Sequence, residues 1–317
     1  MHNEDLIPQY EITLDSLKDV FDVFQPSHAY WTSHFSKTWI FRGQALEKWE
    51  LKPSIFRKEI WDKWGLIEED LDLRSMVEAE FQLIREFAEL CDSAGLQLPE
   101  QAYTYIMNPE IRQFDAFDPK NLQKYQEFPS IELQHILALA QHYNLPTRLL
   151  DFTFDPLAAL FFAAEEPPCG IKENLFFVVY ALNRGLIKSD INQYKEIHTP
   201  TYANENLKHQ KGLFLLDKKA YEALEKGKFP SDMELILKKE FEKKLEREKG
   251  MIDKIENSRY FYRKIKIPEV LRLDILKQLY KRHYNRAHLF PSYENVAATV
   301  KILPLLEPSS GWRRQSK

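Results

Sequence analysis

The chain has 317 residues, of which 44% are hydrophobic, so it is long enough to bury the core of one large domain or two smaller ones. Its 44 Lys and Arg against 48 Asp and Glu give a formal charge of −4, which excludes a general basic field for nucleic acid or an anionic membrane. The 2 cysteines exclude a disulfide framework, and no apolar run approaches the length of about 18 residues that spans a membrane, so we expect a soluble cytoplasmic protein.

The first half of the chain predicts one strand followed by helices. Residues 38–42, TWIFR, alternate between two faces as a strand does, and Gly43 ends this strand. From residue 68 to about 91, apolar residues recur at spacings of three and four, which predicts an amphipathic helix. A second helix is expected over residues 131–143, with Ser130 as its N-cap.

A polar strand and an apolar helix come next. Asn144 suits the left-handed position after the preceding helix. Residues 147–153, TRLLDFT, predict a short strand with polar side chains on both faces. Asp155 is then expected to cap a helix over 156–165, which is apolar on all sides and must therefore be buried.

The second half of the chain alternates strands with charged helices. Residues 174–182 and 210–216 predict strands, and residues 232–257 predict a solvated helix rich in Lys and Glu. Residues 260–267, YFYRKIKI, predict a half-exposed strand at the edge of the sheet, where its lysines would discourage pairing with another chain. Towards the C-terminus we expect a helix over 268–284, and then a short helix and a strand within 288–303.

These elements predict an α+β fold, with a small, mixed, split β-sheet and helical insertions. Repeats and a glycine-rich phosphate loop are both missing from the sequence, which has only 9 Gly. We expect a lead-in at 1–37, one domain at 38–304 with insertions at about 58–130 and 218–258, and a polar tail at 305–317.

Charged residues in two of the predicted strands indicate either a site or internal ion pairs. The Arg42 guanidinium has the planar shape that binds a phosphate or carboxylate, but it could equally pair with Asp151. His142 could act as a general base with Asp151 as its partner. Alternatively, His142 completes a helix C-terminus, and Arg148 and Asp151 pair with neighbours to hold the strand.

A third polar stretch precedes the strand at 210–216. His209 and Gln210 lie just before Gly212, an arrangement that suits either close contact with a ligand or an ordinary turn. Metal binding is not expected, because the nine His are scattered and form no helical pair of ligands. The basic residues at 263–266 could touch a nucleic-acid backbone, although an edge strand explains them more simply.

Several of these stretches together resemble the FRG domain, a prokaryotic and phage-associated family named for its Phe-Arg-Gly motif. The likeness covers roughly residues 38–302, and Asn144 stands where the family usually has Gly, a change that a left-handed backbone tolerates. The matching motifs are FRGQ at 41–44, WELKPSIFR at 49–57, QHYNLPTRLLDFTFDPLAALFFA at 141–163, HQKGLF at 209–214, and Ile-Pro at 267–268 with LFPSYENVA at 289–297.

The order of the motifs is also similar to that of arginine-type ADP-ribosyltransferases. By that resemblance, Arg42 would hold the phosphates or the nicotinamide ribose of NAD, and Asp151 and Thr153 would occupy the place of a Ser-Thr-Ser strand. Gln210 would fall near the catalytic glutamate, and because a neutral amide stabilises a ribosyl cation less than a carboxylate does, Glu205 is its candidate substitute.

The resemblance implies a polar pocket that binds NAD or a related nucleotide, with ADP-ribosyl transfer or NAD cleavage left open. The alternative is a non-catalytic module for ligand sensing or protein interaction, in a phage-defence setting. A small nucleotide and a protein target are the expected partners, without membrane, nucleic acid or metal. The candidate catalytic residues are Gln210, Glu205 and His142, and the candidate ligand-binding residues are Arg42, Gly43, Gln44, Arg148, Asp151, Thr153 and His209.

Overall fold

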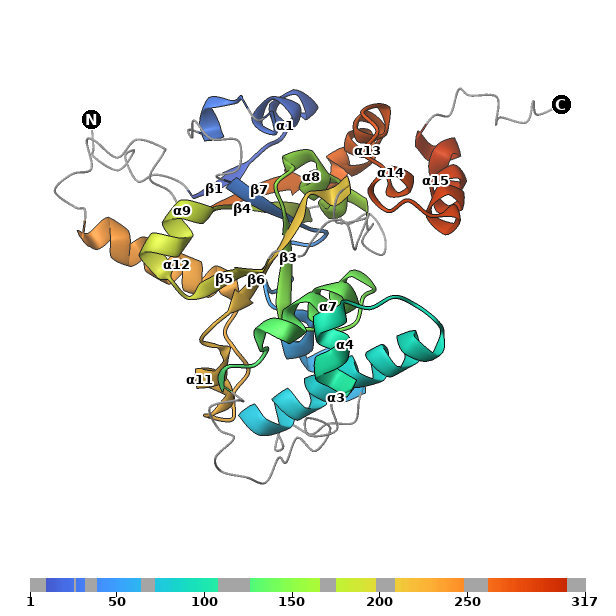
Figure 1. The fold of residues 1–317 in the computed structure, drawn as a ribbon. Coiled ribbons are helices and arrows are strands. Elements are labelled where there is room, and N and C mark those ends of the chain that lie inside the picture. The colour runs from blue at the N-terminus through green and yellow to red at the C-terminus, as the bar shows by residue number, and fades with distance from the viewer. Residues whose placement is uncertain are drawn as a thin grey trace.

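One mixed β-sheet forms the centre of the protein (Figure 1). The computed structural model describes residues 10–25, 27–31, 39–63, 72–107, 126–165, 175–197, 209–247 and 262–306. In these residues the seven strands are ordered β1-β7-β4-β2-β3-β6-β5, and their pairs are antiparallel except for β1 with β7. The strands are β1 (Glu11–Thr13), β2 (Trp39–Gln44), β3 (Leu149–Thr153), β4 (Phe176–Asn183), β5 (Tyr194–Ile197), β6 (Gly212–Asp217) and β7 (Tyr262–Pro268).

The expected combination of helices with a mixed sheet is confirmed, but the sheet is larger than expected. Five of the six predicted strands correspond to β2, β3, β4, β6 and β7. The two outer strands β1 and β5 were missed, because strands of 3 and 4 residues carry too little alternation to be recognised. The sheet is continuous, yet β2 and β3 share only the pair Phe41 with Thr153, whereas β2 and β4 share six pairs.

One face of the sheet is covered by two groups of helices (Figure 1). Over β7, β4 and β2 lie α1 (Leu17–Val23), α8 (Pro156–Glu165) and α13 (Arg272–Lys281), which bury a core that includes Phe41 and Ile265. Over β3, β6 and β5 lie α3 (Leu73–Ser93), α4 (Glu100–Met107) and α7 (Ile131–His142), around Leu149 and Phe214. The junction of β2 and β3 therefore lies between the two groups.

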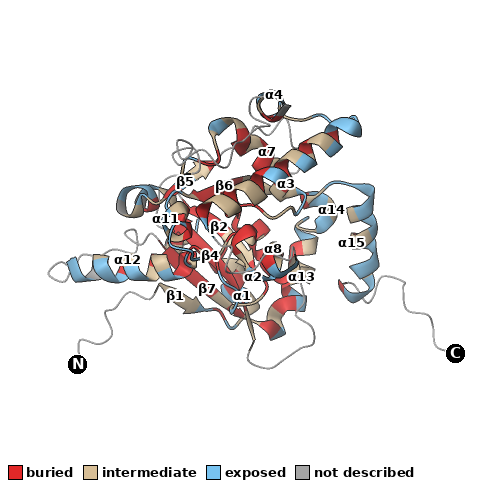
Figure 2. Ribbon diagram, turned by 90° about the horizontal axis from the view of Figure 1, so that it is seen from below, coloured by how far each residue is buried: buried red, intermediate tan, exposed pale blue. Residues whose placement is uncertain are grey.

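The opposite face carries a third core beneath α12 (Met233–Arg247), built on Ile40, Tyr180 and Leu215. Figure 2 shows the buried residues concentrated in the sheet and in the inner faces of the helices, with α12 and α15 exposed at the periphery. The remaining helices are α2 (Lys58–Lys63), α9 (Arg184–Leu186), a π-helical turn (Ile187–Ile191), α11 (Ala220–Leu224), α14 (Arg286–Leu289) and α15 (Tyr293–Leu306).

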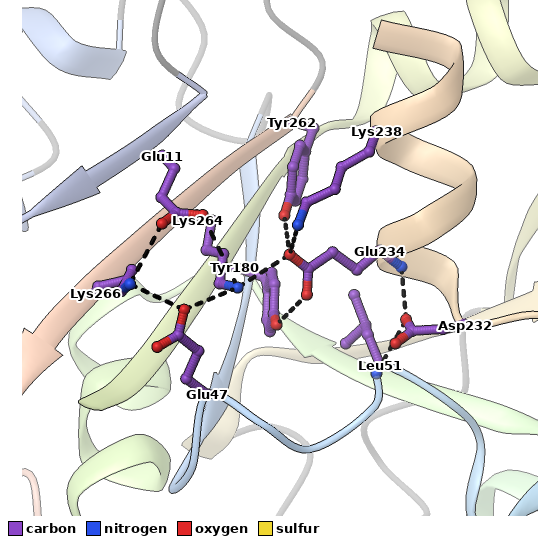
Figure 3. Close-up of polar contacts among 10 residues, drawn as sticks. All are labelled: Glu11, Glu47, Leu51, Tyr180, Asp232, Glu234, Lys238, Tyr262, Lys264 and Lys266. Carbon is purple, nitrogen blue, oxygen red and sulfur yellow. Dashed lines mark hydrogen bonds and ion pairs between the residues drawn. The ribbon is translucent and has the colours of Figure 1, made fainter. Parts of the chain in front are cut away.

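Strand β7 is an interior strand, so the prediction of a half-exposed edge strand was wrong. Strand β1 pairs along the outer edge of β7, and the lysines of β7 are paired with acidic residues, among them Glu11 of β1 (Figure 3). The Nζ atom of Lys264 lies 3.0 Å from Glu234 and 3.3 Å from Glu47, and that of Lys266 lies 3.0 Å from Glu47. The sequence pattern missed this because the acidic partners come from segments far away in the chain.

Glu234 is the centre of this buried network (Figure 3). Its carboxylate accepts hydrogen bonds from Tyr180 at 2.8 Å, Tyr262 at 3.2 Å and Lys264 at 3.0 Å, and it pairs with Lys238. Burial raises the pKa of both tyrosines well above its usual value, and the charge of Glu234 raises it further, so both hydroxyls stay protonated as donors. The network ties α12 to the centre of the sheet.

Other local predictions were met in part. Asn144 adopts the left-handed conformation with φ of 61°, and Asp155 caps α8 by accepting from the backbone N–H of Leu157 at 3.0 Å. Ser130 precedes α7, but its side chain makes no capping hydrogen bond. The strand expected within 288–303 is helical, since α14 and α15 occupy that segment and α15 continues through Pro304. The expected helix residues 68–71 and 248–257 lie outside the described residues.

Candidate functional site

A cavity of about 390 Å³ opens where β2 and β3 separate. Because the two strands pair only at Phe41 and Thr153, the residues beyond this pair face a gap rather than a neighbouring strand. Helices α7 and α8 and the segment after α14 complete its walls. The polar lining residues include Arg42, Gln44, Arg57, Gln141, His142, Asp151, Thr153, Glu165, Gln210 and Arg286, and the aromatic ones include Trp49, Phe162 and Phe290.

Arg42 and Asp151 form an ion pair on the wall of this cavity. The Nη1 atom of Arg42 lies 2.6 Å from Oδ1 of Asp151, and it also donates to the Asp151 carbonyl at 3.0 Å. Partial desolvation by the surrounding pocket walls would raise the pKa of the Asp151 carboxyl, but the Arg42 guanidinium and a hydrogen bond from Gln141 outweigh it and hold that pKa below its usual value. Arg42 also has a buried Nε with no hydrogen-bond partner. The pair is therefore part of the pocket wall and leaves one donor unused.

Two predicted residues next to Arg42 line the pocket in different ways. Gln44 is buried, donates from Nε2 to the Glu50 carbonyl at 3.3 Å, and has an Oε1 atom without a partner. Gly43 allows a close approach of α8 to β2, since a Cβ there would lie 2.0 Å from the Ala159 carbonyl oxygen and 2.6 Å from the Ala163 nitrogen. The glycine of the FRG motif is thus needed for packing of the helix on the strand.

We expect Gly43→Ala to lower the free energy of unfolding by about 1–3 kcal/mol, because the added methyl group overpacks a contact between two backbones. Urea unfolding of both proteins measures the difference. Gly185→Ala is the matched control, since its Cβ would meet only the Asn183 side chain at 3.5 Å. Equal loss of stability in the two variants would contradict the packing role of Gly43.

His142 lies at the end of α7 in the lining of the cavity, and its ring stacks on that of Phe290 with the ring centroids 6.1 Å apart. Burial lowers the pKa of His142, and the nearby charge of Asp151 only partly opposes this. The imidazole is therefore neutral at pH 7 and can accept a proton or a hydrogen bond from a ligand.

Thr153 and Gln210 connect three walls of the cavity. The Thr153 hydroxyl donates to the Gln210 carbonyl at 2.6 Å and accepts from the Asp155 N–H at 2.9 Å. The Gln210 side chain donates from Nε2 to the Leu289 carbonyl at 3.2 Å. Both residues line the pocket as predicted. Their hydrogen bonds connect the neighbouring segments that form its walls, which is a structural role.

Two predicted site residues, Arg148 and His209, are absent from the described lining of the cavity. Arg148 is buried in the helical group beside α3, where its Nε donates to Glu80 at 2.7 Å and its Nη1 to the Phe128 carbonyl at 3.1 Å. This is the structural pairing that the sequence left open for Arg148. His209 lies beside His288, with ring centroids 5.7 Å apart, and is absent from the lining. Glu205 lies outside the described residues.

Sequence reasoning missed several lining residues, among them Trp49, Arg57, Gln141 and Glu165. Two of them, Trp49 and Arg57, begin and end the WELKPSIFR stretch, which matched the family without a role being assigned to it. The described carboxylates of the lining are Asp151 and Glu165, and each is ion-paired, Glu165 with the Arg286 Nε at 2.5 Å. Such a site suits binding of a polar, anionic ligand.

These features define a mixed α/β protein with a polar pocket at an opened strand junction. The family model of the FRG domain matches residues 37–169, a segment that contains β2, α3, α7, β3 and α8. The match supports the FRG family that the motifs indicated, and it includes Arg42, Arg57, His142 and Asp151. The motifs at 209–214 and 289–297 lie beyond the matched segment.

Searches of curated proteins and of solved structures found no match. The likeness to ADP-ribosyltransferases therefore stays a prediction. Among the described residues, no cluster of three His, Cys, Asp or Glu side chains is arranged to hold a metal ion. None of the described helices has both the length and the apolar character needed to cross a bilayer.

Proposed function

We propose that the pocket binds NAD or a related nucleotide. The observation that carries this proposal is the convergence of guanidinium groups and aromatic rings on one cavity: Arg42 and Arg57 with Trp49 and Phe290. Guanidinium groups suit the phosphates of a nucleotide, and aromatic rings suit the faces of a base or a nicotinamide. A cavity of about 390 Å³ also falls within the range of small-molecule sites, which is roughly 300–1,000 Å³.

Binding is better supported than cleavage of the ligand. Cleavage of NAD at the ribose needs a carboxylate that stabilises the developing positive charge. The described carboxylates of the lining are held by Arg42 and Arg286, and the Gln210 side chain is neutral and donates to Leu289. We therefore propose a ligand-binding module, and the test includes an assay for cleavage. A protein target, a role in phage defence and the cytoplasmic location stay predictions.

The test is thermal melting of the protein with NAD, ADP-ribose and AMP, with the same samples assayed for released nicotinamide. A ligand at 100 times its Kd adds about 2.7 kcal/mol of stability, so we expect a clear rise in the melting temperature without nicotinamide release. Release of nicotinamide from NAD would instead show that the protein is an NAD-cleaving enzyme. No stabilisation by any of the three nucleotides would overturn the proposal.

Arg42→Ala is expected to remove the stabilisation by ligand while changing the free energy of unfolding without ligand by only about 1 kcal/mol. The intrinsic cost is small because the side chain of its partner Asp151 is 55% exposed and remains solvated. Arg247→Gln, an exposed substitution at the end of α12, is the control and should leave ligand binding unchanged. An Arg42→Ala protein that still responds fully to ligand would exclude Arg42 from the site.

A further inference from the structure

We infer that Arg57 is the second anion-binding group of the pocket and that, together with Arg42, it binds the phosphate or diphosphate of the nucleotide. This inference rests on the proposed function and deepens it, because it names the part of the ligand that the protein recognises. Nothing in the sequence patterns assigned a role to Arg57.

Local structure holds Arg57 in a defined place. It follows a 3₁₀ turn, Ser54–Phe56, whose Ile55 and Phe56 are buried and whose Ile55 N–H donates to the Thr147 carbonyl at 3.3 Å. The guanidinium of Arg57 then donates from Nε at 3.2 Å and from Nη2 at 3.1 Å to the carbonyl of Lys52. Two hydrogen bonds to one carbonyl orient the guanidinium plane, and its Nη1 donates to no described residue.

The charge of Arg57 is not neutralised by a direct partner. In the described part of the chain no carboxylate lies within 4 Å of its guanidinium, whereas Arg42 has Asp151 at 2.6 Å. Burial and then the like charge of Arg42 lower the pKa of Arg57, and the group still stays protonated at neutral pH. The charges of Asp151, Glu59 and Glu50 oppose this shift without a direct contact. The described lining holds three arginines, Arg42, Arg57 and Arg286, against two carboxylates, Asp151 and Glu165, which leaves one positive charge in excess.

The chemistry of a phosphate fits this arrangement. A phosphoryl group offers three or more oxygen acceptors, so it can accept from two guanidinium groups at once, and charge-assisted pairs of this kind are short and strong. A bound phosphate would also relieve the repulsion between the two arginines.

The first experiment measures binding of adenosine, AMP, ADP-ribose and inorganic diphosphate to the full-length protein by calorimetry. We expect adenosine to bind at least about 10-fold more weakly than AMP, because each charged hydrogen bond that is lost weakens binding by about this factor or more. If adenosine and AMP both bind to the wild-type protein, equal affinities for the two would overturn the inference, whatever the behaviour of the variants.

The second experiment compares Arg57→Gln and Arg57→Lys with Arg247→Gln, the exposed control. We expect Arg57→Gln to weaken ADP-ribose about 10- to 100-fold and to leave adenosine unchanged. Arg57→Lys should retain part of the affinity, since it keeps the charge but loses the planar fork. Circular dichroism checks that each variant is folded, and unchanged binding of ADP-ribose by folded Arg57→Gln would overturn the inference.

The two proposals fail in distinguishable ways. If ADP-ribose binds but Arg57→Gln binds it equally well, the proposed function stands and the role of Arg57 is wrong. If inorganic diphosphate binds in a manner that depends on Arg57 while no nucleotide binds, the anion site stands and the nucleotide proposal is wrong. If none of the four probes binds to the wild-type protein, both are wrong.

Discussion

Replacement of Glu80 by alanine is expected to lower the free energy of unfolding by about 3–5 kcal/mol, because it leaves Arg148 buried without its counter-ion. The two side chains are 0% and 3% exposed, respectively, and lie 2.7 Å apart. Glu80 also accepts from the backbone N–H of Arg148 at 2.9 Å, so the substitution removes the partner of both groups. Urea unfolding followed by circular dichroism measures the loss.

Two further variants test whether the loss of stability is specific to the buried pair of Glu80 and Arg148. Glu78→Ala removes a partly exposed pair with Arg74 on the same helix, and we expect a loss below about 1 kcal/mol. The double substitution Glu80→Leu with Arg148→Met replaces both charges by apolar groups and is expected to recover much of the stability that Glu80→Ala loses. A Glu80→Ala protein as stable as the Glu78→Ala protein would contradict the structural role of Arg148 and return it to the list of site candidates.

Replacement of Glu234 by glutamine is expected to cost a similar amount, about 3–5 kcal/mol at pH 7. The neutral amide leaves Lys264, which is buried, with only the more distant carboxylates of Glu47 at 3.3 Å and Glu11 at 3.9 Å. The NH₂ group of the amide would also face the donors from which the carboxylate now accepts hydrogen bonds. Glu240→Gln, on the same helix and paired with Lys243, is the control and should cost less than about 1 kcal/mol.

The effect of Glu234→Gln is expected to depend on pH. Burial would raise the pKa of Glu234, but hydrogen bonds from Lys238, Tyr180 and Lys264 outweigh it and lower the pKa below its usual value of 4.5. A depressed pKa means that the stabilisation is complete above about pH 4.5 and is lost as pH falls through the lower, folded-state value. The difference between the two proteins should therefore shrink on acidification, and a constant difference from pH 7 down to pH 3 would contradict this.

Local patterns in the chain predicted most of the elements that form the site. The alternation in TWIFR predicts β2, and the Asp155-Pro156 pair predicts the start of α8, because both signals come from residues next to the element itself. The same patterns failed for β1 and β5, which are strands only because β7 and β6 provide hydrogen-bond partners. They also failed for β7, because its alternating lysines predicted a half-exposed edge strand. In the structure these lysines pair with acidic residues from other segments of the chain.

Among the site residues, the sequence alone singled out Arg42, His142, Asp151 and Gln210, which line one cavity, because polar residues inside apolar segments need a partner or a ligand. It could not separate Arg148 from them, because only packing decides which arginine meets Glu80. Only the tertiary structure shows that β2 and β3 separate beyond one residue pair and that Arg57 lies in the cavity formed there. These outcomes depend on contacts between residues far apart in the chain, whereas element type and burial follow from the order of neighbouring residues.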